Sequence, residues 1–204
     1  MTKPLRLVSI AAAVAAVALG NGAARALACG NSQGYSYTRI GSASDAFGIS
    51  AQIAQTSTFD VLNGHVSAWV GVRGKGQGLY GTSNEWLRVG YAGFPSITGS
   101  DLYYEVGLPG RYPTYHQVSA APAVGTYTKV TVLEMHKRPN LWRVWVNHRP
   151  VSPPIKLPGS HDGLKATAIS ESWDGGTGTC NNYSFSFRHL SIADAPGGDW
   201  QQLG

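Results

Sequence analysis

Apolar and polar residues alternate along most of the chain in short runs with a period of two residues, and each run ends at Gly, Pro, Asn or Asp. No apolar stripe with the spacing of an amphipathic helix persists over three turns, so the pattern predicts strands. The predicted strands are 47–55, 65–73, 85–91, 102–106, 127–135, 141–147, 151–157, 165–173 and 183–192. Short strands at this spacing are typical of a β-sandwich or a β-barrel.

Two turns connect three of the predicted strands. Lys137-Arg138-Pro139-Asn140 follows the strand 127–135, and its proline presets φ while its asparagine tolerates the left-handed region. Asn147-His148-Arg149-Pro150 then leads into the strand 151–157. We therefore expect consecutive antiparallel strands from Tyr127 to Leu157.

The first 28 residues have the pattern of a secretory signal peptide. Lys3 and Arg6 precede an apolar run over 7–19, and the segment ends in small residues at Ala26-Leu27-Ala28. A charged start, a short apolar run and this ending are typical of such peptides. The run is too short to cross a bilayer, which needs about 20 apolar residues. We predict cleavage after Ala28, which makes the protein secreted.

The chain has two cysteines, Cys29 and Cys180. In an exported protein two cysteines most simply form a disulfide. The alternative is a lipoprotein anchored through Cys29, which cleavage after Ala28 would leave at the N-terminus. The residues before it match the usual lipoprotein order poorly, so we expect the disulfide.

The composition supports an all-β class and argues against two kinds of partner. Only 13% of the 204 residues are charged and 26 are Gly, whereas globular domains carry about 25% charged residues. Removing the leader with Lys3, Arg6 and Arg25 leaves 13 of the 16 basic residues against 11 acidic ones, a net charge of +2. Nucleic acid and anionic membranes need a basic stripe, so we expect neither as a partner. We expect a monomer with one sandwich domain over 29–193 and a tail over 194–204.

Aromatic residues within the predicted strands are candidates for ligand binding. Strands favour aromatic residues for packing in the core, so each ring has this interpretation beside a role on a concave, ligand-binding face. The set consists of Trp69, Trp86, Tyr103, Tyr104, Trp142, Trp145 and Trp173. From it we select Trp69, Trp86, Tyr104 and Trp173, together with Glu105, as ligand-binding residues for an extracellular peptide or glycan. The histidines lack the spacing of a zinc site, and we predict no metal and no cofactor.

Two glutamates lie within predicted strands, where a carboxylate either faces solvent or is held in a cleft that sets its pKa. Glu105 lies in 102–106 and Glu171 in 165–173. Alternation puts Glu171 on the same face as Ile169 and Trp173, which favours the cleft.

The order of several short motifs resembles the glutamic peptidases (eqolisins) and their bacterial relatives. The motifs lie between Phe47 and Ile192 and read Ser67-Ala-Trp69-Val-Gly71-Val, Trp86-Leu-Arg88-Val-Gly90-Tyr91, Tyr103-Tyr-Glu105, Trp142-Arg-Val-Trp-Val146 and Ala168-Ile-Ser-Glu171-Ser. The resemblance implies a two-sheet antiparallel sandwich of the concanavalin A-like jelly-roll shape.

The resemblance also implies catalytic roles for two residues. The general base of the family corresponds to Glu171, and the glutamine that stabilises the oxyanion corresponds to Arg88. An arginine there can form an ion pair with Glu171 or donate to an oxyanion. Three functions follow: a non-catalytic relative that binds peptide or glycan, an acid-active endopeptidase, or a glycoside hydrolase that uses Glu105 and Glu171.

Overall fold

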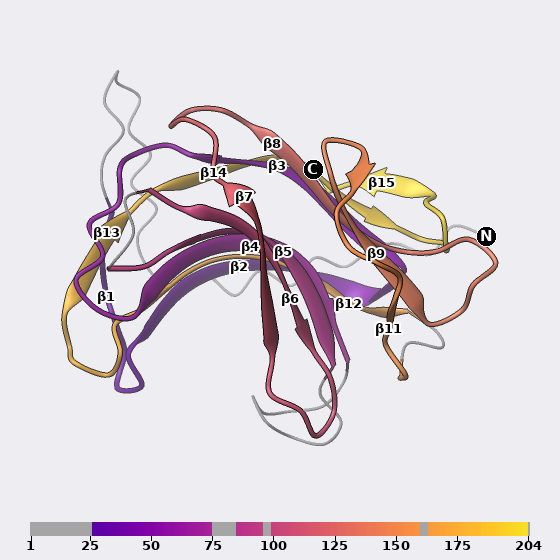
Figure 1. Ribbon diagram of the computed structural model, residues 1–204, viewed down its shortest axis with the longest axis horizontal. Coiled ribbons are helices and arrows are strands. Elements are labelled where there is room, and N and C mark those ends of the chain that lie inside the picture. The colour runs from indigo at the N-terminus through magenta and orange to yellow at the C-terminus, as the bar shows by residue number, and fades with distance from the viewer. Residues whose placement is uncertain (1–25, 75–84, 96–98, 160–162, 204) are drawn as a thin grey trace.

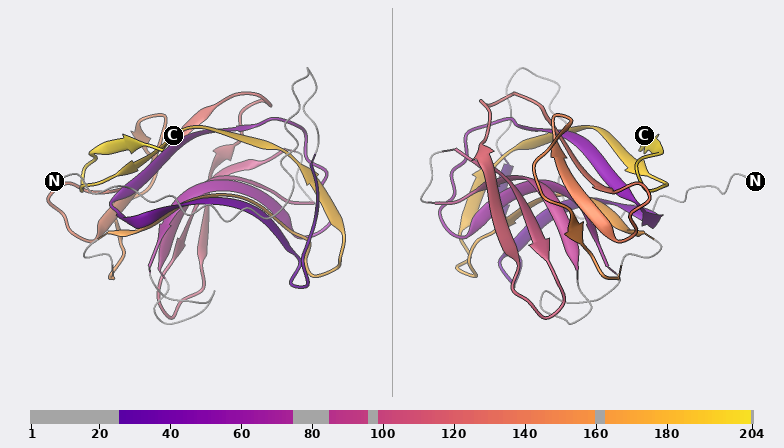
Figure 2. Two further views of the ribbon diagram at one scale, coloured as in Figure 1. Left: turned by 180° about the vertical axis from the view of Figure 1, so that it is seen from behind. Right: turned by 45° about the vertical axis from the view of Figure 1, so that its right-hand side comes forward.

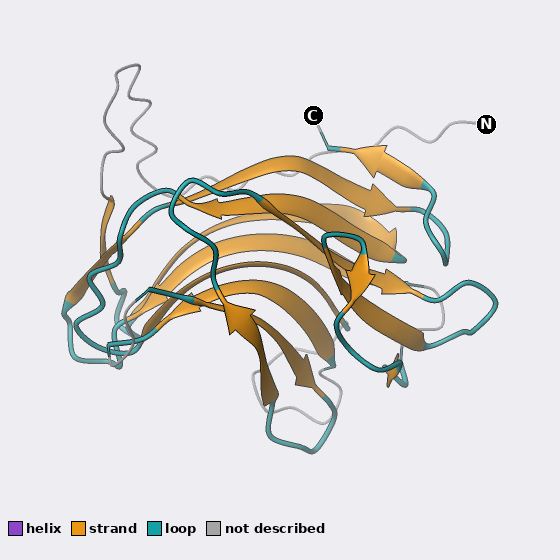
Figure 3. Ribbon diagram, turned by 45° about the horizontal axis from the view of Figure 1, so that its top comes forward, coloured by secondary structure: helices purple, strands orange, loops and turns teal. Residues whose placement is uncertain are grey.

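The computed structural model describes residues 26–74, 85–95, 99–159 and 163–203, and its strands form two stacked antiparallel sheets and a separate two-stranded ribbon (Figure 3). The six-stranded sheet has the order β2 (Tyr35–Ala46), β12 (Leu164–Trp173), β4 (His65–Arg73), β5 (Trp86–Gly93), β6 (Asp101–Gly107) and β7 (Thr114–Ala120). The seven-stranded sheet has the order β10 (Arg149–Pro150), β9 (Leu141–Val146), β8 (Thr128–Glu134), β3 (Gly48–Gln55), β14 (Phe185–Ala193) and β15 (Trp200–Gln202), and β11 (Ile155–Lys156) also pairs with β9. The ribbon consists of β1 (Ala26–Cys29) and β13 (Cys180–Tyr183).

A single apolar core lies between the two stacked sheets. Val70 and Leu87 of the six-stranded sheet meet Val130 and Trp142 of the other, and all four are 0% exposed. These residues occupy alternate positions of their strands, because successive side chains of a strand point to opposite faces. The predicted all-β, two-sheet antiparallel sandwich is therefore confirmed.

The six-stranded sheet is bent into an arch. Figures 1 and 2 show β2, β12, β4 and β5 curving beneath β3, β8 and β14 of the other sheet. The face that is turned away from the second sheet therefore lies on the inside of the bend, and we call it the concave face. It carries every second residue of the strands of the six-stranded sheet, including Ser67, Trp69, Arg88, Glu105 and Glu171, in the register of the sheet.

Most predicted strands are present close to their expected bounds. The predictions 47–55, 65–73 and 165–173 correspond to β3, β4 and β12. The hairpin between β8 and β9 is also present, and Asn140 in its turn has a φ of 64°. This is the left-handed conformation expected of the asparagine.

The predicted strand 151–157 is wrong as a continuous element. Two short strands, β10 and β11, pair with β9 in its place, and residues 151–154, which include Pro153 and Pro154, separate them. Proline has no N–H to donate to a ladder. The hydroxyl of Ser152 accepts a hydrogen bond from the backbone N–H of Val144 at 3.0 Å instead.

The segment predicted as a tail over 194–204 contains a short strand that pairs with the sandwich. β15 pairs with β14, with Trp200 opposite Ala193. The chain reverses through Gly197 and Gly198, whose φ values are 87° and 100°. Glycine adopts such values at no steric cost, so the last residues return to the sheet.

The predicted signal peptide lies almost entirely outside the described residues. The predicted disulfide between Cys29 and Cys180 is confirmed. β1 begins at Ala26, so it includes the last three residues of the expected signal peptide, whereas residues 1–25 lie outside the described part of the chain. No helix among the described residues is long and apolar enough to cross a membrane.

Candidate functional site

Arg88 lies at the centre of a charged cluster on the concave face, between two glutamates from other strands. Arg88 Nη2 is 3.1 Å from Glu105 Oε2 on the neighbouring strand β6. Arg88 Nη1 is 3.3 Å from Glu171 Oε1 on β12, on the far side of β4. The guanidinium of Arg88 also lies 5.0 Å from the ring centroid of Trp69 on β4, which is a cation–π contact. The ion pair with Glu171, one of the two roles considered for Arg88, is therefore present, and Glu105 shares the same cation.

A glycine on β4 makes room for the arginine side chain. Gly71 is the register partner of Arg88, and a Cβ at Gly71 would lie 2.8 Å from the Cβ of Arg88. Such a contact would push the arginine side chain away from its path across β4. The small residue therefore lets Arg88 reach Glu171.

Among the described residues, the hydrogen-bond donors of Glu171 all reach one of its two carboxylate oxygens. Its Oε1 accepts from Ser67 Oγ at 2.9 Å, from Trp69 Nε1 at 3.0 Å and from Arg88 Nη1 at 3.3 Å. Indole and guanidinium nitrogens only donate, so Oε1 acts as an acceptor. Within the described residues no hydrogen bond reaches Oε2, and the side chain is 13% exposed. Oε2 is thus the oxygen that a ligand or water can use.

Glu105 differs from Glu171 because both of its oxygens are occupied. Oε1 accepts from Trp86 Nε1 at 3.2 Å, and Oε2 accepts from Arg88 Nη2 at 3.1 Å. Both partners are donor-only groups. Glu105 therefore holds the indole of Trp86 and the guanidinium of Arg88 in place, and each of its oxygens already has a donor.

A buried tyrosine supports the cluster from β6. Tyr103 is 1% exposed and lies on the concave face two residues from Glu105. Burial raises the pKa of Tyr103, against an opposing effect of Arg88. The phenol therefore stays protonated beside the charged cluster.

The cluster carries an excess of negative charge. Burial acts to lower the pKa of Arg88, but its interactions with Tyr103, Glu105 and Glu171 outweigh burial and raise that pKa. The guanidinium is therefore always charged. One cation between two acceptor carboxylates gives the three groups a formal charge of −1.

An aromatic group lies at one end of the cluster, beyond Glu171. Trp173 is the register partner of His65, and their ring centroids are 5.7 Å apart. On its other side Trp173 stacks with Tyr35 at 6.1 Å. Burial lowers the pKa of His65, although Glu171, with Oε1 at 4.0 Å from Nε2, acts to raise it. The imidazole is therefore neutral at neutral pH.

Trp86 lies at the opposite end of the cluster, near the other end of the strands. Its register partner on β6 is Gly107, and a Cβ there would lie within 2.3–2.4 Å of three atoms of the indole ring. The ring therefore rests directly on the backbone of Gly107. It is half-buried, and its Nε1 donates to Glu105.

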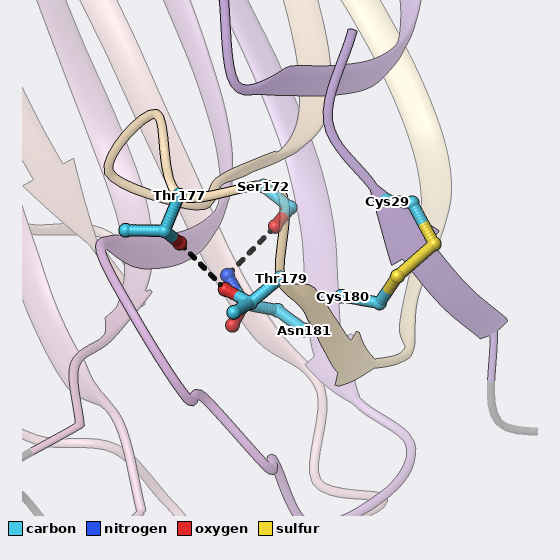
Figure 4. Close-up of a disulfide and its surroundings, with 6 residues drawn as sticks. All are labelled: Cys29, Ser172, Thr177, Thr179, Cys180 and Asn181. Carbon is cyan, nitrogen blue, oxygen red and sulfur yellow. Dashed lines mark hydrogen bonds between the residues drawn. A yellow bond between two sulfur atoms is a disulfide. The ribbon is translucent and has the colours of Figure 1, made fainter.

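The disulfide lies near the end of β12 that carries Trp173 (Figure 4). Next to Cys180 is Asn181, which is 0% exposed. Its Nδ2 donates to Ser172 Oγ at 3.0 Å and to the carbonyl oxygen of Trp173 at 3.3 Å. The cross-link thus holds a side chain that fixes the end of the strand on which Glu171 lies.

The structure brings together most of the residues that the sequence selects. Those on the concave face are Trp69, Trp86, Arg88, Glu105, Glu171 and Trp173. Tyr104 points to the opposite face, where it is 7% exposed within the core and stacks on His116 at 4.5 Å. This placement removes Tyr104 from the site. The ring of Trp69 contacts the guanidinium of Arg88, and its Nε1 donates to Glu171. Trp69 therefore holds these two charged side chains in position.

Three residues of the site were not selected from the sequence. They are His65, Ser67 and Tyr103, and each lies on the concave face. Alternation could have found Tyr103, because it is two residues from Glu105 and therefore on the same face. No sequence signal links His65 or Ser67 to Glu171, since the contact depends on the pairing of β4 with β12.

Comparisons with known proteins find solved structures of similar fold but assign the chain to no family. No family model and no curated protein matches the chain. Among solved structures it is similar to alginate lyase Aly36B (15% identity, TM-score 0.49, covering 80% of this chain and 79% of that one). It is also similar to porphyranase B from Zobellia galactanivorans (10%, 0.41, covering 81% and 67%) and to a heptameric SAP-like pentraxin from Limulus polyphemus (9%, 0.35, covering 81% and 78%).

These similarities are too distant to carry an argument about activity. The expected relation to glutamic peptidases receives no support from any of the comparisons. The function must therefore be argued from the concave face itself.

Proposed function

We propose that the protein binds a glycan on the concave face and does not cleave it. The observation that carries the proposal is the arrangement of two half-buried indoles, Trp86 and Trp173, at opposite ends of a polar cluster. Aromatic rings pack against the C–H faces of sugars, and an open carboxylate oxygen accepts from sugar hydroxyls. Apolar rings with a few placed polar groups are typical of ligand sites.

The position of Arg88 argues against hydrolysis of a glycan. A glycosidase with two carboxyl groups needs the scissile bond between them, and one group must be able to give a proton. Here the guanidinium lies between Glu105 and Glu171, with bonds of 3.1 and 3.3 Å. Both oxygens of Glu105 already accept hydrogen bonds. We therefore assign the cluster to binding.

The disulfide supports an extracellular partner. A bond between Cys29 and Cys180 is typical of proteins in oxidising compartments. The segment before Cys29 has the sequence pattern of a signal peptide. We propose that the protein is secreted and meets its glycan outside the cell.

A glycan array with the purified protein tests the proposal. We expect binding of the wild type and at least a tenfold loss for both Trp86→Ala and Trp173→Ala. The matched control is Trp200→Ala, because Trp200 is 41% exposed on the other sheet. Equal binding by all four proteins, or no binding by the wild type, would contradict the proposal.

A second candidate is an acid-active peptidase, favoured by the open Oε2 of Glu171 beside the Arg88 guanidinium. Peptide hydrolysis of this kind needs a general base with a free acceptor oxygen, and it needs a nearby donor that stabilises the oxyanion. Incubation with denatured casein at acid pH tests this activity, with Glu171→Gln as the inactive control. Cleavage by the wild type that Glu171→Gln abolishes would favour the peptidase, and we expect no cleavage.

A further inference from the structure

We infer that the ligand is a linear, uncharged glycan that is long enough to contact both indole ends of the concave face. This inference rests on the proposed function and specifies the class of ligand. Two features carry it, the distance between the two indoles along the strands and the charge that lies between them.

The first feature is the separation of Trp86 and Trp173. In the register of the sheet, Trp86 pairs with Arg73, and Arg73 pairs with Lys165 of β12. Trp173 lies eight residues beyond Lys165 on that strand. At about 3.3 Å per residue the two ends are about 26 Å apart along the strands, and the bend of the sheet shortens the direct path. A disaccharide is too short to reach both indoles, whereas a chain of several sugars can.

The two indoles differ in what supports them. Trp86 rests on the backbone of Gly107, and no other ring or cation among the described residues contacts it. Trp173 lies between Tyr35 and His65. The two indoles therefore rest on different groups, and each contributes to binding only when the ligand reaches it.

The second feature is the charge at the middle of the concave face. Glu105, Glu171 and Asp101 carry three negative charges against the single positive charge of Arg88. Asp101 also lies on this face, where it accepts from Gln117 Nε2 at 2.6 Å. A polyanion crossing the face would meet these carboxylates, whose repulsion disfavours it.

The other charged side chains of the face lie on its edge strand or toward the ends of its strands. Arg39 is on the edge strand β2, opposite Ile169 of β12, and Arg73 ends β4; both are exposed. Lys165 is paired with Asp45 at 3.0 Å. Solvent and salt screen exposed cations strongly, so they do not offset the half-buried acids. An uncharged sugar instead brings a hydroxyl that can donate a hydrogen bond to Oε2 of Glu171.

Calorimetric titration with oligosaccharides of increasing length tests the inference. The neutral probes are the di-, tetra- and hexasaccharides of β-1,4-linked glucose, xylose, mannose and N-acetylglucosamine. For the series that binds best, we expect the hexasaccharide to bind at least tenfold more tightly than the disaccharide. Hexasaccharides of galacturonate and of mannuronate are the charged counterparts, and we expect at least tenfold weaker binding from them.

Variants separate the two ends of the site. Trp86→Ala and Trp173→Ala should each remove most of the gain between disaccharide and hexasaccharide, whereas Trp200→Ala keeps the full gain. Gly107→Ala is a second test at the Trp86 end, because it removes no surface group and displaces the indole. Gly107→Ala should lower the affinity for the hexasaccharide as Trp86→Ala does.

The outcomes distinguish this inference from the proposed function. Equal affinities for disaccharide and hexasaccharide, or tighter binding of the uronate chains, would overturn the inference and leave glycan binding intact. Failure of every neutral chain while an array glycan of another kind binds would do the same. Absence of binding to any glycan in both experiments would overturn the proposed function as well.

Discussion

The two faces of the six-stranded sheet are made from the same strands but are held together in different ways. On β5, Leu87 faces the core and is 0% exposed, while its neighbour Arg88 faces the concave side. On β6, Tyr104 likewise faces the core, and its neighbour Glu105 faces the concave side. The core face requires apolar groups of suitable size. The concave face requires that each polar group has its own partner.

This difference predicts different responses to substitution. A smaller side chain on the core face leaves a cavity but no unpaired charge. A change on the concave face leaves a partner such as Glu105 or Glu171 without its donor. The core face thus determines stability, and the concave face determines ligand binding at a smaller cost in stability.

The largest effect on stability is expected on the core face. Leu87→Ala should lower the free energy of unfolding by about 2–5 kcal/mol through lost burial and the cavity that remains. Urea unfolding followed by fluorescence measures this loss. The folded fraction should bind glycan with wild-type affinity. A change in affinity in protein that is still folded would show that the two faces are not independent.

Removal of the central cation should have a smaller effect on stability and a larger one on binding. Arg88→Met leaves Glu105 and Glu171 without their shared partner, and we expect a loss of about 1–3 kcal/mol because Arg88 is 21% exposed. Thermal unfolding measures it, and glycan binding should fall at least tenfold. Arg143→Met on β9 is the control, since no ion pair involves Arg143 among the described residues. A larger loss in the control would contradict the account.

Insertion of one methyl group under Trp86 should separate binding from stability further. Gly107→Ala places a Cβ within 2.3–2.4 Å of the indole, so the ring must move and its bond to Glu105 is lost. We expect a loss of stability of about 1 kcal/mol, as for one side-chain hydrogen bond. The fluorescence of Trp86 should change, and unchanged fluorescence would show that the ring does not rest on Gly107.

The smallest effect is a dependence of stability on pH through His65. Its pKa is lowered by burial in the folded protein, so the folded state binds fewer protons there than the unfolded state. The stability that this provides is present above the ordinary histidine pKa of about 6.5 and is lost as the pH falls through the lowered value.

The melting temperature of His65→Gln measures this contribution. The variant should lose less stability than the wild type between pH 7.5 and pH 5. His136→Gln is the control, because His136 is exposed. If His65→Gln and the wild type lose stability in parallel, the burial of His65 has no such consequence.

The pattern of the sequence was sufficient for the core strands and for the grouping of residues by face. Alternation separated Glu171 and Trp173 from the core side of β12. It could not reveal β2 and β7, because these edge strands carry mostly exposed residues and need no apolar alternation.

The assembly of the site could not be predicted in the same way. β12 lies between β2 and β4, which brings Glu171 beside Ser67 although they are 104 positions apart. The reach of Arg88 to Glu171 depends on this order and on the register of three strands. Sequence alternation fixes the face of a residue, whereas strand order and register fix its neighbours.

A titration of the protein with the tightest-binding neutral hexasaccharide, followed by NMR of the indole N–H groups of its six tryptophans, tests glycan binding on the concave face most directly. We expect the signals of Trp86 and Trp173, at both ends of the concave face, to shift. Signals from Trp142, Trp145 and Trp200, which belong to the other sheet, should stay in place. Shifts confined to the tryptophans of the other sheet would contradict glycan binding on the concave face.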